Sequence, residues 1–294
     1  MRISDRSSAD RLLQHIHTAT TRLNETQERV ASGRRINRPS DDPFATARTL
    51  AARTRLDLIG QRSRTVDLAN TELSATESSL VALGNVMTRA QELAVQADSS
   101  AIDSSGRLQI ATEVSELLNE ALSIANTTHA GRALFGGHQT GNAFTPDVPA
   151  NPTTFAFNGD QGQVLREIGE GERIPVNIEG EALFDGVFAS LVAFRDALMS
   201  NDRTALNAAA GDIGFEIEGV LTARGEVGAR MRRLELAGLR LEDDDLALRT
   251  EIAGLEEIDI TAEVVELQMR DSAFQAALSA TSRSLGVSLL DFLR

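Results

Sequence analysis

Apolar residues recur at every seventh position through a long central stretch of the sequence. One line consists of Ala52, Ile59, Val66, Leu73, Leu80, Met87 and Ala94, and a second line consists of Ala69, Thr76, Leu83, Ala90 and Ala97. Heptads sustained over six intervals are typical of a coiled coil rather than of a helix on a globular domain. A helix from Ala52 to Ala97 spans on the order of 70 Å at about 1.5 Å per residue, so the spacing predicts an elongated molecule.

The two ends of the chain show the same spacing. The N-terminal apolar residues are Leu13, Ile16, Leu23 and Val30. The C-terminal lines contain Leu234, Leu241, Leu248, Leu255, Ala262 and Met269, followed by Leu267, Phe274, Leu278, Leu285, Leu289 and Leu290. We expect the terminal helices to pair side by side, because each then covers the apolar line of the other. Pairing of each end with other molecules is the alternative, and a polymer can use both arrangements.

Shorter amphipathic segments lie between these ends. A turn at 99–106 precedes a helical pattern from Ile110 to Ile124, which a short connection should place antiparallel to the helix before it. Two further helical patterns cover Phe188 to Leu198 and, approximately, 202–223.

The segment from Gly136 to about residue 186 has a different composition, rich in Gly, Pro, Asn and Thr. Residues 153–157 alternate in polarity as a strand does, and the following Asn158-Gly159-Asp160 is a hairpin signal. Residues 173–178 alternate as well, and Pro175 should place them at the edge of a sheet.

Together these patterns predict a mainly α fold: an elongated rod of long coiled-coil-like helices from both termini, with a small β-rich insertion. The expected parts are 1–42 and 255–294, the halves of a terminal coiled-coil domain; 43–135 and 187–254, the halves of a helical rod domain; and 136–186, the outer insertion.

The segment before residue 43 predicts a helix start. Asp42 can cap the helix, and Pro43 suits the first helical position because its missing N–H is not needed there. Asp41 and Asp42 also have the composition of a catalytic carboxylate pair, but their place before Pro43 favours capping.

Charge and composition exclude several functional classes. The net charge of −14 argues against nucleic-acid binding, and the absence of Cys excludes disulfides and thiolate chemistry. Residues 1–64 nevertheless carry a net +6 and the remainder −20, which suggests electrostatic matching within or between subunits. We expect no membrane helix and no cleavable signal peptide, since neither pattern is visible, and the default localisation is therefore cytoplasmic.

No residue pattern predicts catalysis, a cofactor or a metal. His15 and His17 are two apart on a predicted helix and so point to different faces, and Asp243–Asp245 are expected on a solvated helix face. The glycines of the insertion precede no helix N-terminus, which gives an enzymatic or ligand-binding insertion only weak support. We therefore expect a protein that is not an enzyme.

Four motifs resemble the bacterial flagellin family. They are Ala31-Ser32-Gly33-Arg34-Arg35-Ile36, Asn37-Arg38-Pro39-Ser40-Asp41-Asp42-Pro43, Leu134-Phe135-Gly136-Gly137 and Ser288-Leu289-Leu290-Asp291-Phe292-Leu293. Arg38 replaces the Ser that is usual in the second motif. The last two motifs are most similar to the branch that joins the flagellar hook to the filament. Filament flagellins typically carry Pro-Gln before the closing leucines, where this chain has Arg283 to Val287.

The resemblance implies a structural subunit that leaves the cell through the flagellar export channel, which replaces the cytoplasmic default. It implies a hook-associated protein on the hook side, flagellin on the filament side, a ring of identical subunits, and an export chaperone on the C-terminal helix. A filament-forming flagellin is the alternative. The residues expected to carry assembly are Leu13, Ile16, Leu23, Val30, Leu267, Phe274, Leu278, Leu285, Leu289 and Leu290. Those expected to form the domain joint are Asn37, Ser40, Asp41, Asp42 and Pro43.

Overall fold

The structure is a computed structural model that describes residues 2–99, 102–149 and 151–292, with side chains described between residues 10 and 282 of these. Its contacts divide the chain into two compact units. The first unit combines Met1–Leu58 with Asp243–Arg294, and the second is Ile59–Glu242. Helices dominate both units and short strands occur only in the second unit's described residues, so the predicted mainly α class with a small β-containing region is confirmed.

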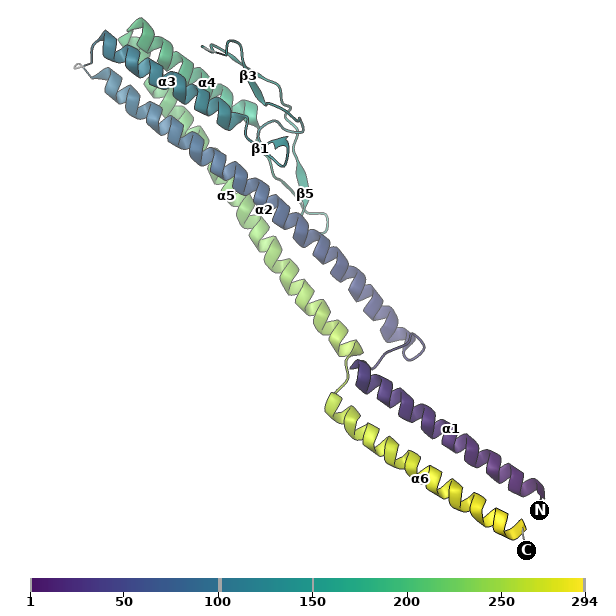
Figure 1. Cartoon of the computed structure of the whole chain (residues 1–294). Coiled ribbons are helices and arrows are strands. Elements are labelled where there is room, and N and C mark those ends of the chain that lie inside the picture. Colours follow the sequence, from purple (N-terminus) through teal and green to yellow (C-terminus); the bar gives the residue numbers. More distant parts are fainter. Residues whose placement is uncertain (1, 100–101, 150, 293–294) are drawn as a thin grey trace. The chain divides into compact units, whose positions relative to one another are not determined.

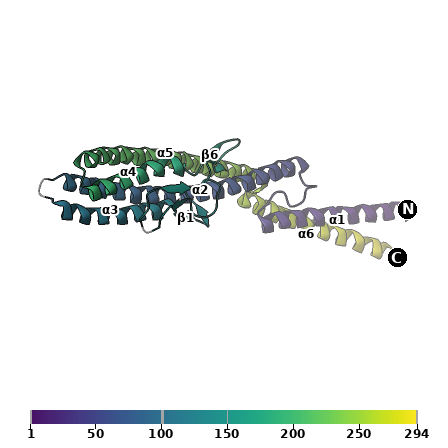
Figure 2. The same ribbon diagram turned by 90° about the horizontal axis from the view of Figure 1, so that it is seen from above.

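In the first unit, helix α1 (Arg2–Ser32) lies side by side with helix α6 (Ile260–Phe292), as both views show (Figures 1 and 2). The two helices are antiparallel, because Arg29 near the end of α1 pairs with Glu263 near the start of α6 at 2.6 Å. Pairing of the two ends of the chain, expected from their heptads, is therefore present within one molecule.

Two long helices pass through both units. They are α2 (Pro43–Asp98) and α5 (Arg203–Glu256). Within the second unit they pack antiparallel, with Arg224 of α5 bound to Glu77 of α2 at 2.9 Å. Every residue of the two predicted lines on α2 is buried, none of them more than 9% exposed. The heptads therefore identified the packed face correctly.

The line on α5 is longer than the sequence suggested. Its buried residues are Leu206, Ile213, Val220, Val227, Leu234 and Leu241, again seven apart. The two segments expected at 202–223 and from 234 onward form one continuous helix, because nothing between them breaks the heptad line.

Helices α3 (Ser104–Ala125) and α4 (Gly180–Ser200) pack against each other in the second unit (Figures 1 and 2). Asp103 caps α3 by accepting a hydrogen bond from the Gly106 N–H at 2.9 Å. The buried Arg107 then ties the helix ends together, because it donates to the Ala97 carbonyl and to the Asn201 side chain.

The strands form three separate antiparallel pairs. They are β1 (Thr128–His129) with β2 (Arg132–Ala133), β3 (Phe144–Pro146) with β4 (Phe155–Phe157), and β5 (Leu165–Glu167) with β6 (Arg173–Pro175). Pro175 lies in a two-stranded pair, where every strand is an edge strand, as its sequence position suggested.

The prediction of a hairpin turn at Asn158-Gly159-Asp160 is wrong. Strand β4 pairs with the preceding β3 and not with a strand that follows it. A type I′ turn needs positive φ at both central residues, and neither Asn158 nor Gly159 has positive φ. Asp160 instead accepts hydrogen bonds from the N–H groups of His138 and Gly162, at 3.0 and 2.8 Å.

A cluster of phenylalanines joins the strands to α4, although only 4% of the chain's residues are aromatic. Its members are Phe135, Phe144, Phe155, Phe157, Phe184 and Phe188. The Leu134-Phe135-Gly136-Gly137 motif anchors this cluster, since Phe135 is fully buried with its ring 4.9 Å from that of Phe184. Gly137 has φ +67°, and a Cβ there would lie 2.2 Å from the Asp160 carbonyl oxygen.

Candidate functional site: a two-segment joint

In the first unit, two segments that connect helices lie next to each other. One is 33–42, between α1 and α2, and the other lies between α5 and α6. Arg34 and Glu257 form an antiparallel bridge, the Arg35 N–H donates to the Glu256 carbonyl at 2.6 Å, and the Ile258 N–H donates to that of Gly33 at 3.3 Å. We call residues 33–42 and 256–259 the joint.

The two aspartates of the joint hold backbone N–H groups. The Asp42 Oδ1 accepts from the Ala45 N–H at 2.9 Å, which caps α2 as predicted, and Pro43 is the first residue of the helix. The Asp41 Oδ2 accepts from the N–H groups of Asn37 and Arg38, at 3.0 and 2.8 Å. Both carboxylates therefore fix the path of the connection, which agrees with the capping interpretation of the pair.

The pKa of the Asp42 carboxyl lies below its ordinary value. The hydrogen bond from the Ala45 N–H is the main cause. Desolvation opposes it, and the Arg35 guanidinium at 3.3 Å adds to the lowering. The anionic form is stabilised because both partners donate to it.

Arginines from the N-terminal side of the joint bind acceptors from the C-terminal side. Arg35 donates to the Leu255 carbonyl at 2.8 Å, and Arg53 donates to both carboxylate oxygens of Glu256 at 2.8 Å each. Arg34 lies 4.0 Å from the same carboxylate. This is the electrostatic matching suggested by the basic first 64 residues, here within one chain.

Sequence reasoning missed the C-terminal half of the joint, Glu256 above all. Its side chain is only 15% exposed and receives two arginines. The only available signal was the excess of arginine in residues 1–64, which predicted charge matching but named no acidic partner.

The remaining joint residues have smaller roles. The Asn37 side chain donates to the Arg34 carbonyl at 3.5 Å. Ser40 is exposed, and among the described residues its side chain has no hydrogen-bond partner.

The predicted assembly residues differ in exposure. Leu23 is buried, whereas Leu13 is 60% and Leu278 43% exposed. Those half-buried are Ile16, Val30, Leu267 and Phe274. Those whose side chains lie outside the described residues are Leu285, Leu289 and Leu290. The terminal pair therefore leaves apolar side chains uncovered within one molecule, and the assembly role of these residues stays a prediction.

Across the residues that the structure describes, no group of three or more His, Asp or Glu side chains is placed to hold a metal ion. None of the described helices is long and apolar enough to cross a membrane.

Comparison with known proteins assigns the family. The model of the bacterial flagellin N-terminal helical region matches residues 3–140, and that of the bacterial flagellin C-terminal helical region matches residues 211–293. Together they cover well over half of the chain.

Individual relatives match over most of this chain's length. Flagellar hook-associated protein 3 of Escherichia coli K12 is 23% identical over 89% of this chain and 90% of its own length. A flagellin of Bacillus subtilis strain 168 is 27% identical over the full length of both. The flagellar junction protein FlgL from Legionella pneumophila, a crystal structure, is similar in fold with a TM-score of 0.62 and 15% identity, over 71% of this chain and all of that one. The chain therefore belongs to the bacterial flagellin family.

Proposed function

We propose that this chain is a structural subunit of the bacterial flagellum that forms the junction between hook and filament. The observation that carries the proposal is its similarity to hook-associated protein 3 of E. coli, which extends over 89% of this chain and 90% of that protein. The closing Ser288-Leu289-Leu290-Asp291-Phe292-Leu293 motif supports it, because the Pro-Gln typical of filament flagellins is absent before it.

Assembly proceeds through the terminal helices in this proposal. Leu13 on α1 and Leu278 on α6 are exposed in the isolated chain, and burial of such side chains against neighbouring helices supplies the driving force for association. The neighbours are further copies in a ring, a hook-associated protein on the hook side and flagellin on the filament side. An export chaperone covers the C-terminal helix before assembly, and the subunit is exported without cleavage of a signal peptide.

The joint keeps the terminal pair in place during assembly. Its ion pairs and backbone hydrogen bonds connect the start of α2 with the end of α5 within the first unit. A force applied to α1 or α6 is therefore resisted by contacts on both connections rather than by one stretch of chain.

A filament-forming flagellin is the second candidate, favoured by the 27% identity to the B. subtilis flagellin. A seeding experiment distinguishes the junction role from the flagellin role. Purified chain is added to short flagellar filament seeds, and elongation is followed by electron microscopy with purified flagellin as the positive control. We expect no elongation by this chain alone, because a junction subunit occupies a single position in the structure. Long filaments grown from this chain alone would contradict the junction role and favour flagellin.

A further inference from the structure

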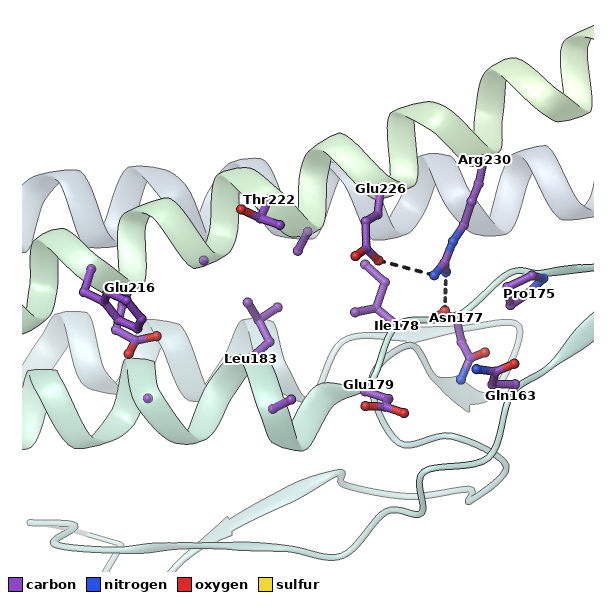
Figure 3. A pocket seen from close by; sticks show the side chains of 15 residues that line it. Gln163, Pro175, Asn177, Ile178, Glu179, Leu183, Glu216, Thr222, Glu226 and Arg230 are labelled. Carbon is purple, nitrogen blue, oxygen red and sulfur yellow. Dashed lines mark hydrogen bonds and ion pairs between the residues drawn. The ribbon is translucent and has the colours of Figure 1, made fainter.

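A groove lies in the second unit between α4, α5 and the segment from Gln163 to Glu179 (Figure 3). Its volume is about 410 Å³, within the range of roughly 300–1,000 Å³ in which proteins bind small groups. Apolar side chains form part of its wall, including Ile178 and Leu183, and Glu179, Glu216 and Glu226 add three carboxylates.

Glu216 is the most unusual of these carboxylates. It reaches from α5 toward α4, where residue 186 is a glycine (Figure 3). A Cβ at residue 186 would lie 2.4 Å from the Glu216 Oε1, so the carboxylate in its present position occupies the space beside a residue without a side chain. No described residue pairs with it. Desolvation, with a smaller effect of Asp212, raises the pKa of Glu216, which a cation at the carboxylate would reverse.

The single arginine of the groove does not neutralise Glu216. Arg230 donates to the Asn177 carbonyl at 2.7 Å and to Glu226 at 3.4 Å (Figure 3). Next to Glu216 on α5, Phe215 is 76% exposed, an unusual state for a phenylalanine. The groove therefore combines an unpaired carboxylate with an uncovered aromatic ring.

We propose that this groove binds an arginine side chain from a second copy of this chain. A guanidinium can donate two parallel hydrogen bonds to the Glu216 carboxylate and stack its plane on the Phe215 ring. An ammonium group lacks both the flat face and the paired donors. The chain has 29 arginines and no lysine, so the permanently charged cationic side chains that a neighbouring copy presents are guanidinium groups.

Charge complementarity identifies the second copy as the source of the arginine. Residues 1–64 carry 13 arginines and a net +6, whereas the rest of the chain, which contains the groove, carries −20. The arginines Arg22, Arg55 and Arg64 in this basic region are exposed and form no ion pair with any described residue. Arginines of one copy are thus available to the acidic groove of another.

Self-association tests the proposal directly. The association of the full chain is measured by sedimentation over a range of concentrations for wild type, Glu216→Gln and Glu218→Gln. Glu218 is exposed on the same helix outside the groove, so its variant makes the same change in charge elsewhere. We expect Glu216→Gln to weaken association about tenfold or more and Glu218→Gln to leave it within about twofold, as one lost charged hydrogen-bond pair implies.

A small probe separates guanidinium recognition from simple charge. N-acetyl-arginine amide should compete with self-association and shift the amide resonances of Gly186 and Gly219, and N-acetyl-lysine amide should do so much less. Equal effects of the two probes would overturn the proposal. A chain that stays monomeric, or a Glu216→Gln variant that associates like wild type, would also overturn it.

This inference rests on the proposed function in one respect, since an assembly of identical subunits brings two copies together. The two proposals can nevertheless be contradicted independently of each other. Unchanged association of Glu216→Gln would remove the groove contact and leave the junction role untouched, whereas filament growth from this chain alone would remove the junction role and not the contact.

Discussion

Arg53 on α2 donates to both carboxylate oxygens of Glu256, the last residue of α5, at 2.8 Å each. The backbone carbonyl of the same glutamate accepts the Arg35 N–H at 2.6 Å. One residue therefore holds the connection between α1 and α2 through its backbone and the body of α2 through its side chain.

Replacing Glu256 should loosen the joint. In Glu256→Gln the bonds to Arg53 weaken and the charge attraction of Arg34 is lost, so the Arg35 amide should exchange its hydrogen about five- to tenfold faster, equivalent to about 1 kcal/mol. Native-state hydrogen exchange of that amide is the measurement.

The matched control is Glu251→Gln, which removes an exposed pair with Arg48 at 3.0 Å, earlier on α5 than Glu256. It should change the exchange of the Arg35 amide by less than about twofold, because exposed pairs contribute little. Equal effects of the two variants would show that Glu256 has no special role in the joint.

The cap of α2 should respond to acid. Because the folded pKa of Asp42 is lowered, its stabilising effect is complete above the unfolded pKa and is lost as pH falls through the folded pKa. The Ala45 amide resonance should therefore titrate with a midpoint below the ordinary Asp range of about 3.9.

The control for this titration is Asp42→Asn, which can still accept from the Ala45 N–H but cannot ionise in this range. Its Ala45 resonance should show no such transition. A wild-type midpoint at or above the ordinary Asp value would contradict the observed donors.

Two glycines of positive φ allow a test of whether the close approach of the Asp160 backbone requires glycine at residue 137. Gly137 (φ +67°) and Gly131 (φ +80°) share the left-handed conformation, but a Cβ would meet the Asp160 carbonyl only at residue 137. Gly131→Ala should cost about 1–2 kcal/mol from conformation alone. Gly137→Ala should cost roughly 1–3 kcal/mol more, because neighbouring backbone must move.

Urea unfolding followed at the phenylalanine cluster of the second unit is the measurement for these two variants. A similar loss of stability in both would mean that conformation, and not the contact with Asp160, explains the glycine of the Leu134-Phe135-Gly136-Gly137 motif.

Substitutions of two leucines on α1 should distinguish an effect on the stability of the isolated chain from an effect on assembly. Leu23 is buried and Leu13 is 60% exposed. Leu23→Ala should destabilise the pairing of α1 with α6 in the isolated chain by about 2–3 kcal/mol, toward the low end for a buried leucine because α1 is covered on one side. Leu13→Ala should change it by less than about 0.5 kcal/mol.

In cells the same two variants should both reduce assembly, since Leu13 is uncovered only until a neighbour binds. Hydrogen exchange of α1 measures the first effect, and recovery of the subunit in isolated flagella measures the second. Normal incorporation of the Leu13→Ala chain would remove this leucine from the assembly surface.

Periodicity predicted the helical part of the fold well. A heptad line such as Ile59, Val66 and Leu73 reports directly on which face of a helix is packed, and all three residues are buried. The cap at Asp42 was equally accessible, because capping depends on residues three apart in sequence.

The rest of the site depends on contacts between residues far apart in sequence. The pair of Arg53 with Glu256 joins positions 203 residues apart, and nothing local marks Glu256 among the many acidic residues of α5. Asn158-Gly159 was misjudged for a related reason, since the bonds of Asp160 to His138 and Gly162 override the local turn preference.

Deletion of the gene for this chain in its native bacterium tests the junction role most directly. Hooks and filaments are examined by electron microscopy, and flagellin is measured in the culture medium, with a plasmid copy of the gene as the control. The account predicts intact hooks without filaments, flagellin lost to the medium, and restoration of filaments by the plasmid. Normal filaments on the deletion strain would contradict it.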